Sequence, residues 1–234
     1  SRGGELDKPD GLSPGVAWAT VPAFMTRSVM AGTSMATPQA TGVHALLISA
    51  ALTEQVPWNA DLLKRALKAT AKSVRGTTRV DAGAGLIQVG KAYRVLKKIA
   101  NKAQVHVLAG WRVKTAVPSQ PGNRSTASYW RTGHYVPGYP RQVTFEISPA
   151  FYKDATDAQR KAFFETLRLR SSAGWLRADR STLGVRSGRP ARIRVTINRD
   201  RVKKPGLHVG VISATPRSSD DAAAFSLPVV IAMP

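Results

Sequence analysis

One stretch of the sequence combines residue types that could carry out nucleophilic chemistry. It reads Ala-Gly-Thr-Ser-Met-Ala-Thr-Pro over residues 31–38 and stands directly before a segment without charged side chains. Pro38 is tolerated in the first turn of a helix, so the pattern places Ser34 at a helix N-terminus. There, unpaired backbone N–H groups and the positive end of the helix dipole stabilise negative charge. Ser34 could therefore attack a carbonyl and help bind the oxyanion, provided that a base takes its proton.

An isolated serine before a helix is more commonly a plain N-cap. Ser34, however, lies in an octapeptide that resembles the nucleophile motif of the subtilisin-like serine peptidases, the subtilases. Three other segments resemble motifs of this family in the same order: residues 1–3 (SRG), 8–15 (KPDGLSPG, with Ser13 where the family usually has Ala) and 83–87 (GAGLI). Residues 17–22, 85–89 and 91–93 most resemble the tripeptidyl peptidase II branch of the family.

The resemblance implies a function and a set of roles. Ser34 would be the catalytic nucleophile that forms an acyl-enzyme during peptide-bond hydrolysis, and Gly32 and Thr33 would contribute to substrate binding. Members of this branch remove tripeptides from free N-termini and form large homo-oligomers, so a peptide or protein substrate and a homo-oligomer are expected. No cofactor and no metal site are expected.

The family's other catalytic residues are not found in this sequence. Subtilases order their triad Asp, His, Ser, with an oxyanion-binding Asn between His and Ser. The histidines at positions 44, 106, 134 and 208 all lack the family's His-Gly-Thr context, and His44 lies about 15 Å along the same predicted helix from Ser34. We therefore expect Asp, His and Asn to precede residue 1, and this C-terminal segment alone to be inactive.

Three predicted helices would position Ser34. The first, over residues 34–52, is apolar or small on nearly all faces, which predicts burial on all sides. The helices over 59–71, with Asn59 as N-cap, and over 89–100 each have one apolar stripe and one charged face. That pattern is typical of surface helices that cover a core.

Beyond about residue 103 the hydrophobic period changes to two, as in strands with one wet face. Alternating runs predict strands near residues 105–111, 143–147, 167–169, 193–197, 207–211 and 225–233, with a helical insertion over 157–165. We interpret residues 1–102 as the C-terminal part of an α/β, three-layer subtilisin-like catalytic domain. Residues 103–234 are interpreted as an all-β antiparallel sandwich of the fibronectin type III kind.

The composition excludes some functions and leaves others open. The 234 residues contain no cysteine, which excludes disulfides and thiol catalysis, and no apolar segment is uniform enough to span a membrane. The net charge of +21 divides into +8 over residues 1–102 and +13 over 103–234. A solvated basic surface is the simpler explanation, and nucleic-acid binding would then be weak and non-specific. The alternative function is a non-catalytic basic binding module, either a degenerate peptidase remnant or a sandwich that binds a polyanion or an acidic envelope. A secreted or cell-envelope location is slightly favoured over the cytoplasm.

Overall fold

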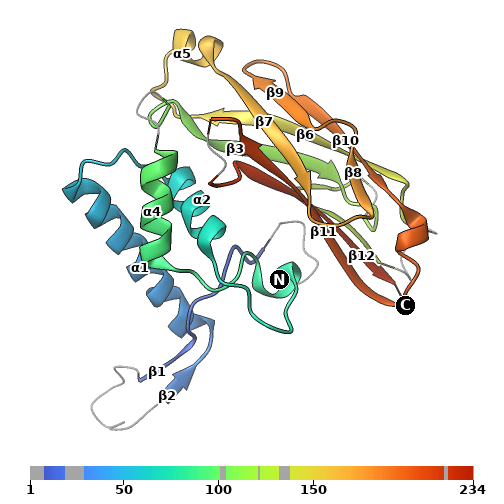
Figure 1. Ribbon diagram of the computed structural model, residues 1–234, viewed down its shortest axis with the longest axis horizontal. Coiled ribbons are helices and arrows are strands. Elements are labelled where there is room, and N and C mark those ends of the chain that lie inside the picture. The colour runs from blue at the N-terminus through green and yellow to red at the C-terminus, as the bar shows by residue number, and fades with distance from the viewer. Residues whose placement is uncertain are drawn as a thin grey trace.

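The computed structural model describes residues 8–18, 29–100, 104–120, 122–131, 138–218 and 221–233. The long helices of residues 33–70 and 89–99 gather on one side of the molecule, and the two large sheets lie on the other side with the short helix of residues 157–162 (Figure 1). The first two strands, β1 (Val16–Trp18) and β2 (Val29–Ala31), project from the side of these helices. The SRG motif at residues 1–3, most of the segment 17–22 and His134 lie outside the described residues.

The three predicted helices are confirmed, with small changes at their ends. They are α1 (Thr33–Thr53), α2 (Ala60–Thr70) and α4 (Val89–Ile99), and a short α3 (Arg79–Ala82) was not predicted. Asn59 is the N-cap of α2, and its Oδ1 accepts a hydrogen bond from the Leu62 N–H at 2.8 Å. The apolar stripes of α2 and α4 pack against each other and against Leu47 and Ala51 of α1.

The predicted burial of α1 on all sides is wrong. Within this helix only Leu47 and Ala51 are buried, while Leu46 and Leu52 are 60% and 63% exposed. Among the described elements, α4, β1 and β2 make the most contacts with α1, and the apolar stripe of α2 meets it at Leu47 and Ala51. A helix that is apolar on all faces is buried only when other elements pack on every side of it, and the described elements do not do so.

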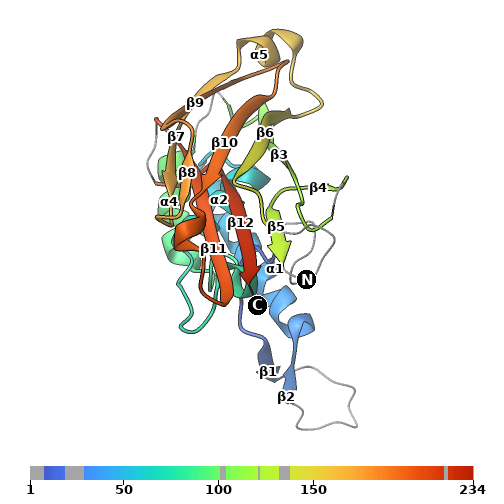
Figure 2. The same cartoon turned by 90° about the vertical axis from the view of Figure 1, so that its right-hand side faces the viewer.

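The sheet part consists of two five-stranded sheets around a shared core. Figures 1 and 2 show the two sheets packed one against the other. One sheet has the order β4-β3-β6-β10-β8 and the other the order β5-β12-β11-β7-β9. A single helix, α5 (Asp157–Ala162), lies between β6 and β7, where the insertion was predicted. The strands are β3 (Leu108–Ala116), β4 (Arg124–Ser125), β5 (Ser128–Arg131), β6 (Gln142–Phe151), β7 (Phe164–Ser171), β8 (Leu176–Ala178), β9 (Thr182–Arg186), β10 (Ala191–Ile197), β11 (Gly206–Pro216) and β12 (Phe225–Met233).

The expectation of an entirely antiparallel sheet pair is not met. β5 and β12 run parallel, with Val229 opposite Ser128 and Val230 opposite Tyr129, whereas every other described pair in the two sheets is antiparallel. Strands joined by a hairpin must be antiparallel, but β5 and β12 are far apart in sequence, so no turn fixes their direction. The fold is mixed α/β, and the domain boundary near residue 103 stays a prediction.

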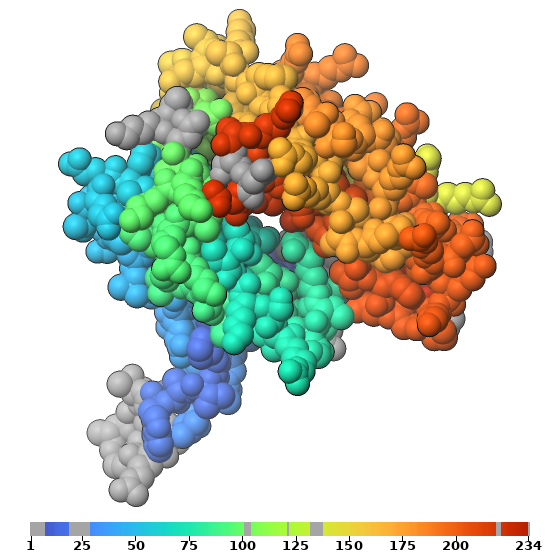
Figure 3. Space-filling model, in the orientation of Figure 1, coloured from blue at the N-terminus to red at the C-terminus, as the bar shows by residue number. Residues whose placement is uncertain are grey.

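Two polar side chains of the helical part hold the sheet part in place. The Asn59 Nδ2 donates to the carbonyl oxygens of Val105 at 2.9 Å and Leu108 at 3.1 Å. The Arg65 guanidinium donates to Ala223 at 3.1 Å and Ala222 at 3.3 Å, just before β12. Beside these contacts a cleft of about 420 Å³ opens between α2 and the two sheets. Figure 3 shows this hollow between the teal helical residues and the orange and red strands.

Candidate active site

Ser34 lies just after a strand-to-helix turn. β1 (Val16–Trp18) and β2 (Val29–Ala31) form an antiparallel pair, with Val16 opposite Ala31. The pairing extends one step further, because the Gly32 N–H donates to the Gly15 carbonyl at 2.8 Å. The helix α1 then starts at Thr33, so Ser34 is its second residue and is exposed.

Gly32, not Ser34, is the N-cap of α1, so the interpretation of Ser34 as a plain N-cap is wrong. Gly32 has φ 155° and ψ 177°, a conformation that L side chains rarely adopt, although nothing lies within 4 Å of where its Cβ would be. Its carbonyl accepts from the N–H groups of Met35 at 3.1 Å and Ala36 at 3.2 Å. The leading N–H groups, those of Thr33 and Ser34, have no carbonyl one turn earlier and can bind an anion.

Ser13 fastens the first turn of α1. Its hydroxyl donates to the Ala36 carbonyl at 2.5 Å, which joins the KPDGLSPG segment to the helix two residues beyond Ser34. In the sequence Ser13 was only a departure from the usual Ala of the family motif. Its role depends on a partner 23 positions away and has no local signal.

The structure brings the KPDGLSPG and GAGLI segments side by side. The Leu12 N–H donates to Gly85 at 2.8 Å, and the Ile87 N–H donates back to Leu12 at 3.0 Å. Leu86 also exchanges two backbone hydrogen bonds with Lys72, both at 2.8 Å. Residues 10–13 are thereby held between α1 and the chain segment that leads into α4.

Asp10, a residue of the KPDGLSPG segment, is surrounded by three lysines. Its carboxylate accepts from Lys64 at 3.0 Å, from Lys68 at 3.1 Å and from Lys8. Partial burial opposes ionisation of Asp10, but the hydrogen bonds and charges of the three lysines outweigh it and hold the pKa well below its ordinary value. Two of these lysines belong to α2, so the cluster ties the KPDGLSPG segment to that helix.

In the described part of the chain, no histidine forms a hydrogen bond with Ser34. The His44 ring is bound through Nδ1 to the Ala40 carbonyl of its own helix at 2.8 Å. The His208 Nε2 contacts the Lys204 carbonyl at 2.8 Å, and His106 is exposed at the start of the sheet part. The described residues also contain no group of three acidic or histidine side chains that could hold a metal ion, and no helix among them is long and apolar enough to cross a membrane.

A strand, a positive-φ glycine and an exposed serine at a helix start place a hydroxyl beside backbone N–H groups that can bind an anion. Residues 10–88 match the model of the subtilase family. The chain carries a subtilase segment. The matched range contains Gly32, Thr33 and Ser34, Asp10 with its partners Lys64 and Lys68, and the two glycines of the GAGLI motif.

Two relatives and one solved structure extend the likeness past the subtilase segment. Tripeptidyl-peptidase 2 of Oryza sativa subsp. japonica is 31% identical over 180 residues, which cover 74% of this chain. Pyrolysin of Pyrococcus furiosus is 35% identical over 127 residues, or 49% of the chain. The crystal structure of tripeptidyl peptidase 2 aligns over 88% of the chain with a TM-score of 0.68 and 26% identity. The chain is thus similar to tripeptidyl peptidase 2 in sequence and in fold.

The chain spans only a small part of these relatives. It covers 13% of the rice protein, 9% of pyrolysin and 16% of the chain in the crystal structure.

Proposed function

We propose that this chain is part of a subtilisin-like serine peptidase whose nucleophile is Ser34. The observation that carries the proposal is the position of Ser34, exposed on the second residue of α1 and directly after Gly32. In this role the Ser34 hydroxyl attacks the scissile carbonyl, and the Ser34 N–H stabilises the oxyanion that forms. Gly32 and Thr33 would line the path of the substrate backbone, since the open space beside Gly32 lets another chain approach.

The proton of Ser34 must leave as its oxygen attacks, and this requires a general base that the described residues do not place beside it. In the proposed enzyme, a His oriented by an Asp takes the proton and later gives it to the leaving amine. As the amine leaves, an acyl-enzyme forms on the Ser34 oxygen. Water then attacks the acyl group while the His takes a proton from the water, and the His gives that proton to the Ser34 oxygen as the acid product leaves. The His and the Asp, and an Asn that assists the oxyanion, would come from outside this chain segment.

A fluorophosphonate probe tests the nucleophile in the protein that contains the proposed Asp and His. We expect Ser34 to be labelled and Ser34→Ala to lose both labelling and turnover, by several orders of magnitude. Ser49→Ala is the matched control, because Ser49 is an exposed serine on the same helix. Labelling of another serine, or an active Ser34→Ala enzyme, would refute the assignment.

A second experiment tests where the base comes from. The 234 residues alone should show no peptidase turnover, because Ser34 without a general base is a weak nucleophile. Turnover by this segment that Ser34→Ala abolishes would show that the base lies within the chain.

For the substrate, we propose N-terminal tripeptides, because the relatives that cover most of the chain are tripeptidyl peptidases. The active protein should then release a fluorophore from a tripeptide with a free amino terminus and fail on the N-acetylated peptide. Equal rates on both would indicate an endopeptidase. Assembly into a homo-oligomer likewise stays a prediction.

A further inference from the structure

One face of the molecule concentrates basic side chains on a flat sheet. On the sheet β4-β3-β6-β10-β8, the side chains that point away from the core include exposed arginines and lysines from four strands, and Arg180 follows the edge strand. We call this surface the basic face, and its cations are Arg112, Lys114, Arg124, Arg177, Arg180, Arg192 and Arg194.

The alternation of each strand places these side chains on one side. Val113, Phe145 and Ile193 pack in the core, so their neighbours in β3, β6 and β10 point outward. The register aligns Lys114 of β3 and Arg192 of β10 on either side of Glu146 of β6. The cations therefore lie along β3 and along β10, and at Glu146 one cation from each strand lies in the same row across β6.

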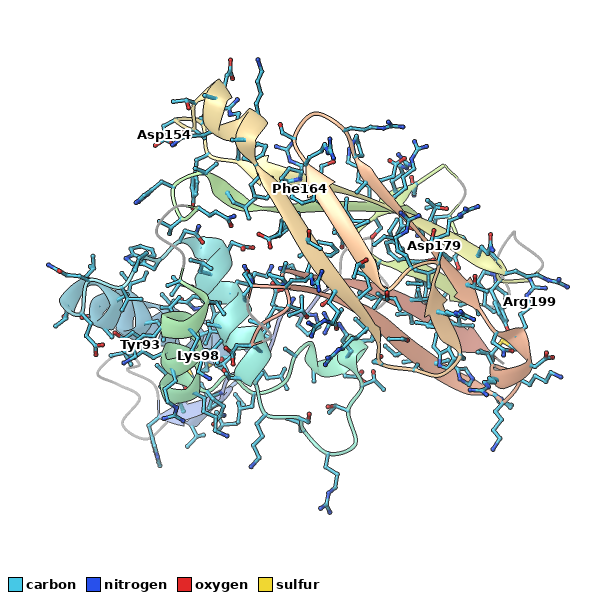
Figure 4. All side chains as sticks on the ribbon, turned by 45° about the horizontal axis from the view of Figure 1, so that its top comes forward. Tyr93, Lys98, Asp154, Phe164, Asp179 and Arg199 are labelled. Atoms are coloured by element: carbon cyan, nitrogen blue, oxygen red, sulfur yellow. The ribbon has the colours of Figure 1, made fainter. Side chains whose placement is uncertain are left out.

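The basic face already binds carboxylates between pairs of arginines. Glu146 lies 3.0 Å from Arg124 and 3.0 Å from Arg192. Asp179 lies 2.9 Å from Arg180 and 3.8 Å from Arg194, and Figure 4 shows Asp179 over the sheets, away from the helices. An arginine has five N–H donors, and one shared carboxylate engages few of them. Most donors of these exposed arginines are still directed at solvent.

We propose that the basic face binds an acidic polypeptide segment in an extended conformation. Arg192 and Arg194 are two residues apart on one strand, a spacing of about 7 Å, which equals the spacing of carboxylates at alternate positions of an extended chain. Each added carboxylate can then lie between guanidinium groups, as Glu146 and Asp179 do. This interaction is separate from peptide-bond hydrolysis and does not involve Ser34.

The side chains between the cations favour a polypeptide over a nucleic acid. Single-stranded nucleic acids are usually held by aromatic side chains on which the bases stack. The outward positions of β3, β6 and β10 hold no aromatic ring between the charges, only small, hydroxyl and amide residues such as Ala116, Thr144, Gln142 and Thr196.

Binding of fluorescent poly-L-glutamate at physiological ionic strength, followed by anisotropy, tests the proposal. The variant Lys114→Gln/Arg192→Gln/Arg194→Gln should weaken binding on the order of tenfold. The matched control, Arg75→Gln/Lys91→Gln/Arg94→Gln, removes the same charge from exposed positions of the helical part and should change binding less than about twofold. Equal weakening in both variants would show that only total charge matters and would overturn the proposal.

Two further measurements separate the remaining outcomes. Arg192→Lys/Arg194→Lys keeps the charge but removes the planar fork, so it should weaken poly-L-glutamate binding several-fold without the folding risk of the triple variant. A single-stranded oligonucleotide of the same length should bind more weakly than poly-L-glutamate. Tighter oligonucleotide binding that the triple variant abolishes would assign the face to nucleic acid and refute an acidic polypeptide.

Discussion

Gly83 and Gly85 explain why the GAGLI motif needs glycine at two positions. A Cβ on Gly83, whose φ is 60°, would lie 2.2 Å from the Pro9 carbonyl oxygen, and one on Gly85, whose φ is 110°, would lie 2.3 Å from that of Lys72. Both neighbours are backbone atoms, which cannot move aside as the end of a flexible side chain could. Here the crowding and the backbone conformation act together, whereas at Gly32 only the conformation requires glycine.

Gly85→Ala should therefore lower the free energy of unfolding by more than about 2 kcal/mol, as judged by urea denaturation. Gly90→Ala is the control, because Gly90 lies in α4 with nothing within 4 Å of its Cβ position. It should raise stability by about 0.5–1 kcal/mol, since alanine favours helix. A mild effect at Gly85 would mean that the contact between residue 85 and Lys72 is loose.

At this scale the candidate site was predictable in part. Gly32 and Pro38 flank Ser34 closely enough that local rules locate it at a helix start, as the structure has it. The Ser13 hydrogen bond and the lysines around Asp10 join residues from distant positions, and no local pattern reports such contacts.

Among the elements, α2 is joined to the KPDGLSPG segment by a charge cluster that depends on pH. The pKa of Asp10 is below its ordinary value of 3.8 because the three lysines outweigh its partial burial. A carboxyl whose pKa is depressed on folding stabilises the protein above its unfolded pKa and loses that effect as the pH falls toward its folded pKa. The contribution of Asp10 should thus be complete at pH 7 and decline below about pH 4.

The comparison of wild type with Asp10→Asn measures this contribution. The difference in unfolding free energy should be positive at pH 7 and shrink steadily as the pH is lowered from about 4. Asp200→Asn, which removes an 85% exposed carboxylate, should show almost no difference at either pH. A gap for Asp10→Asn that does not change with pH would mean that the stabilisation does not depend on ionisation of Asp10, and would contradict the prediction.

The helices and strands differ in how well they could be predicted from their sequences. α2 and α4 were predictable because each has one buried and one wet face, so the period is visible. The position of α1 in the sequence was predicted, but its exposure was not. A helix that is apolar on all faces has no period that indicates which face is covered. β1 and β2 were missed because their side chains are mostly exposed and show no alternation of buried and exposed positions that could mark them.

For the whole molecule, Asn59 is the residue that most directly couples the helices to the sheets. It caps α2 and also donates to two carbonyls of the chain that enters β3. Asn59→Ala should lower the free energy of unfolding by about 2–3 kcal/mol, because it removes the cap and leaves buried acceptors unpaired. Thr156→Ala removes an exposed cap of α5 and should lower it by only about 1 kcal/mol. Equal losses in denaturant titrations would show that Asn59 acts only as a cap.

The order of the molecule, helices first and strands after, followed from the change of hydrophobic period near residue 103. The parallel pairing of β5 with β12 did not, because period-two patterns fix which face of a strand is buried but not the direction of its neighbour.

That parallel pairing also has a mechanical consequence. β12 lies inside its sheet, bonded to β11 along its whole length and to β5 on the other side. A force that pulls Met233 along the axis of β12 therefore loads two ladders at once, so that many hydrogen bonds bear it together. A strand at a sheet edge would instead open bond by bond from its end. Against a force in that direction, β12 is thus a firmly held strand of the sheet.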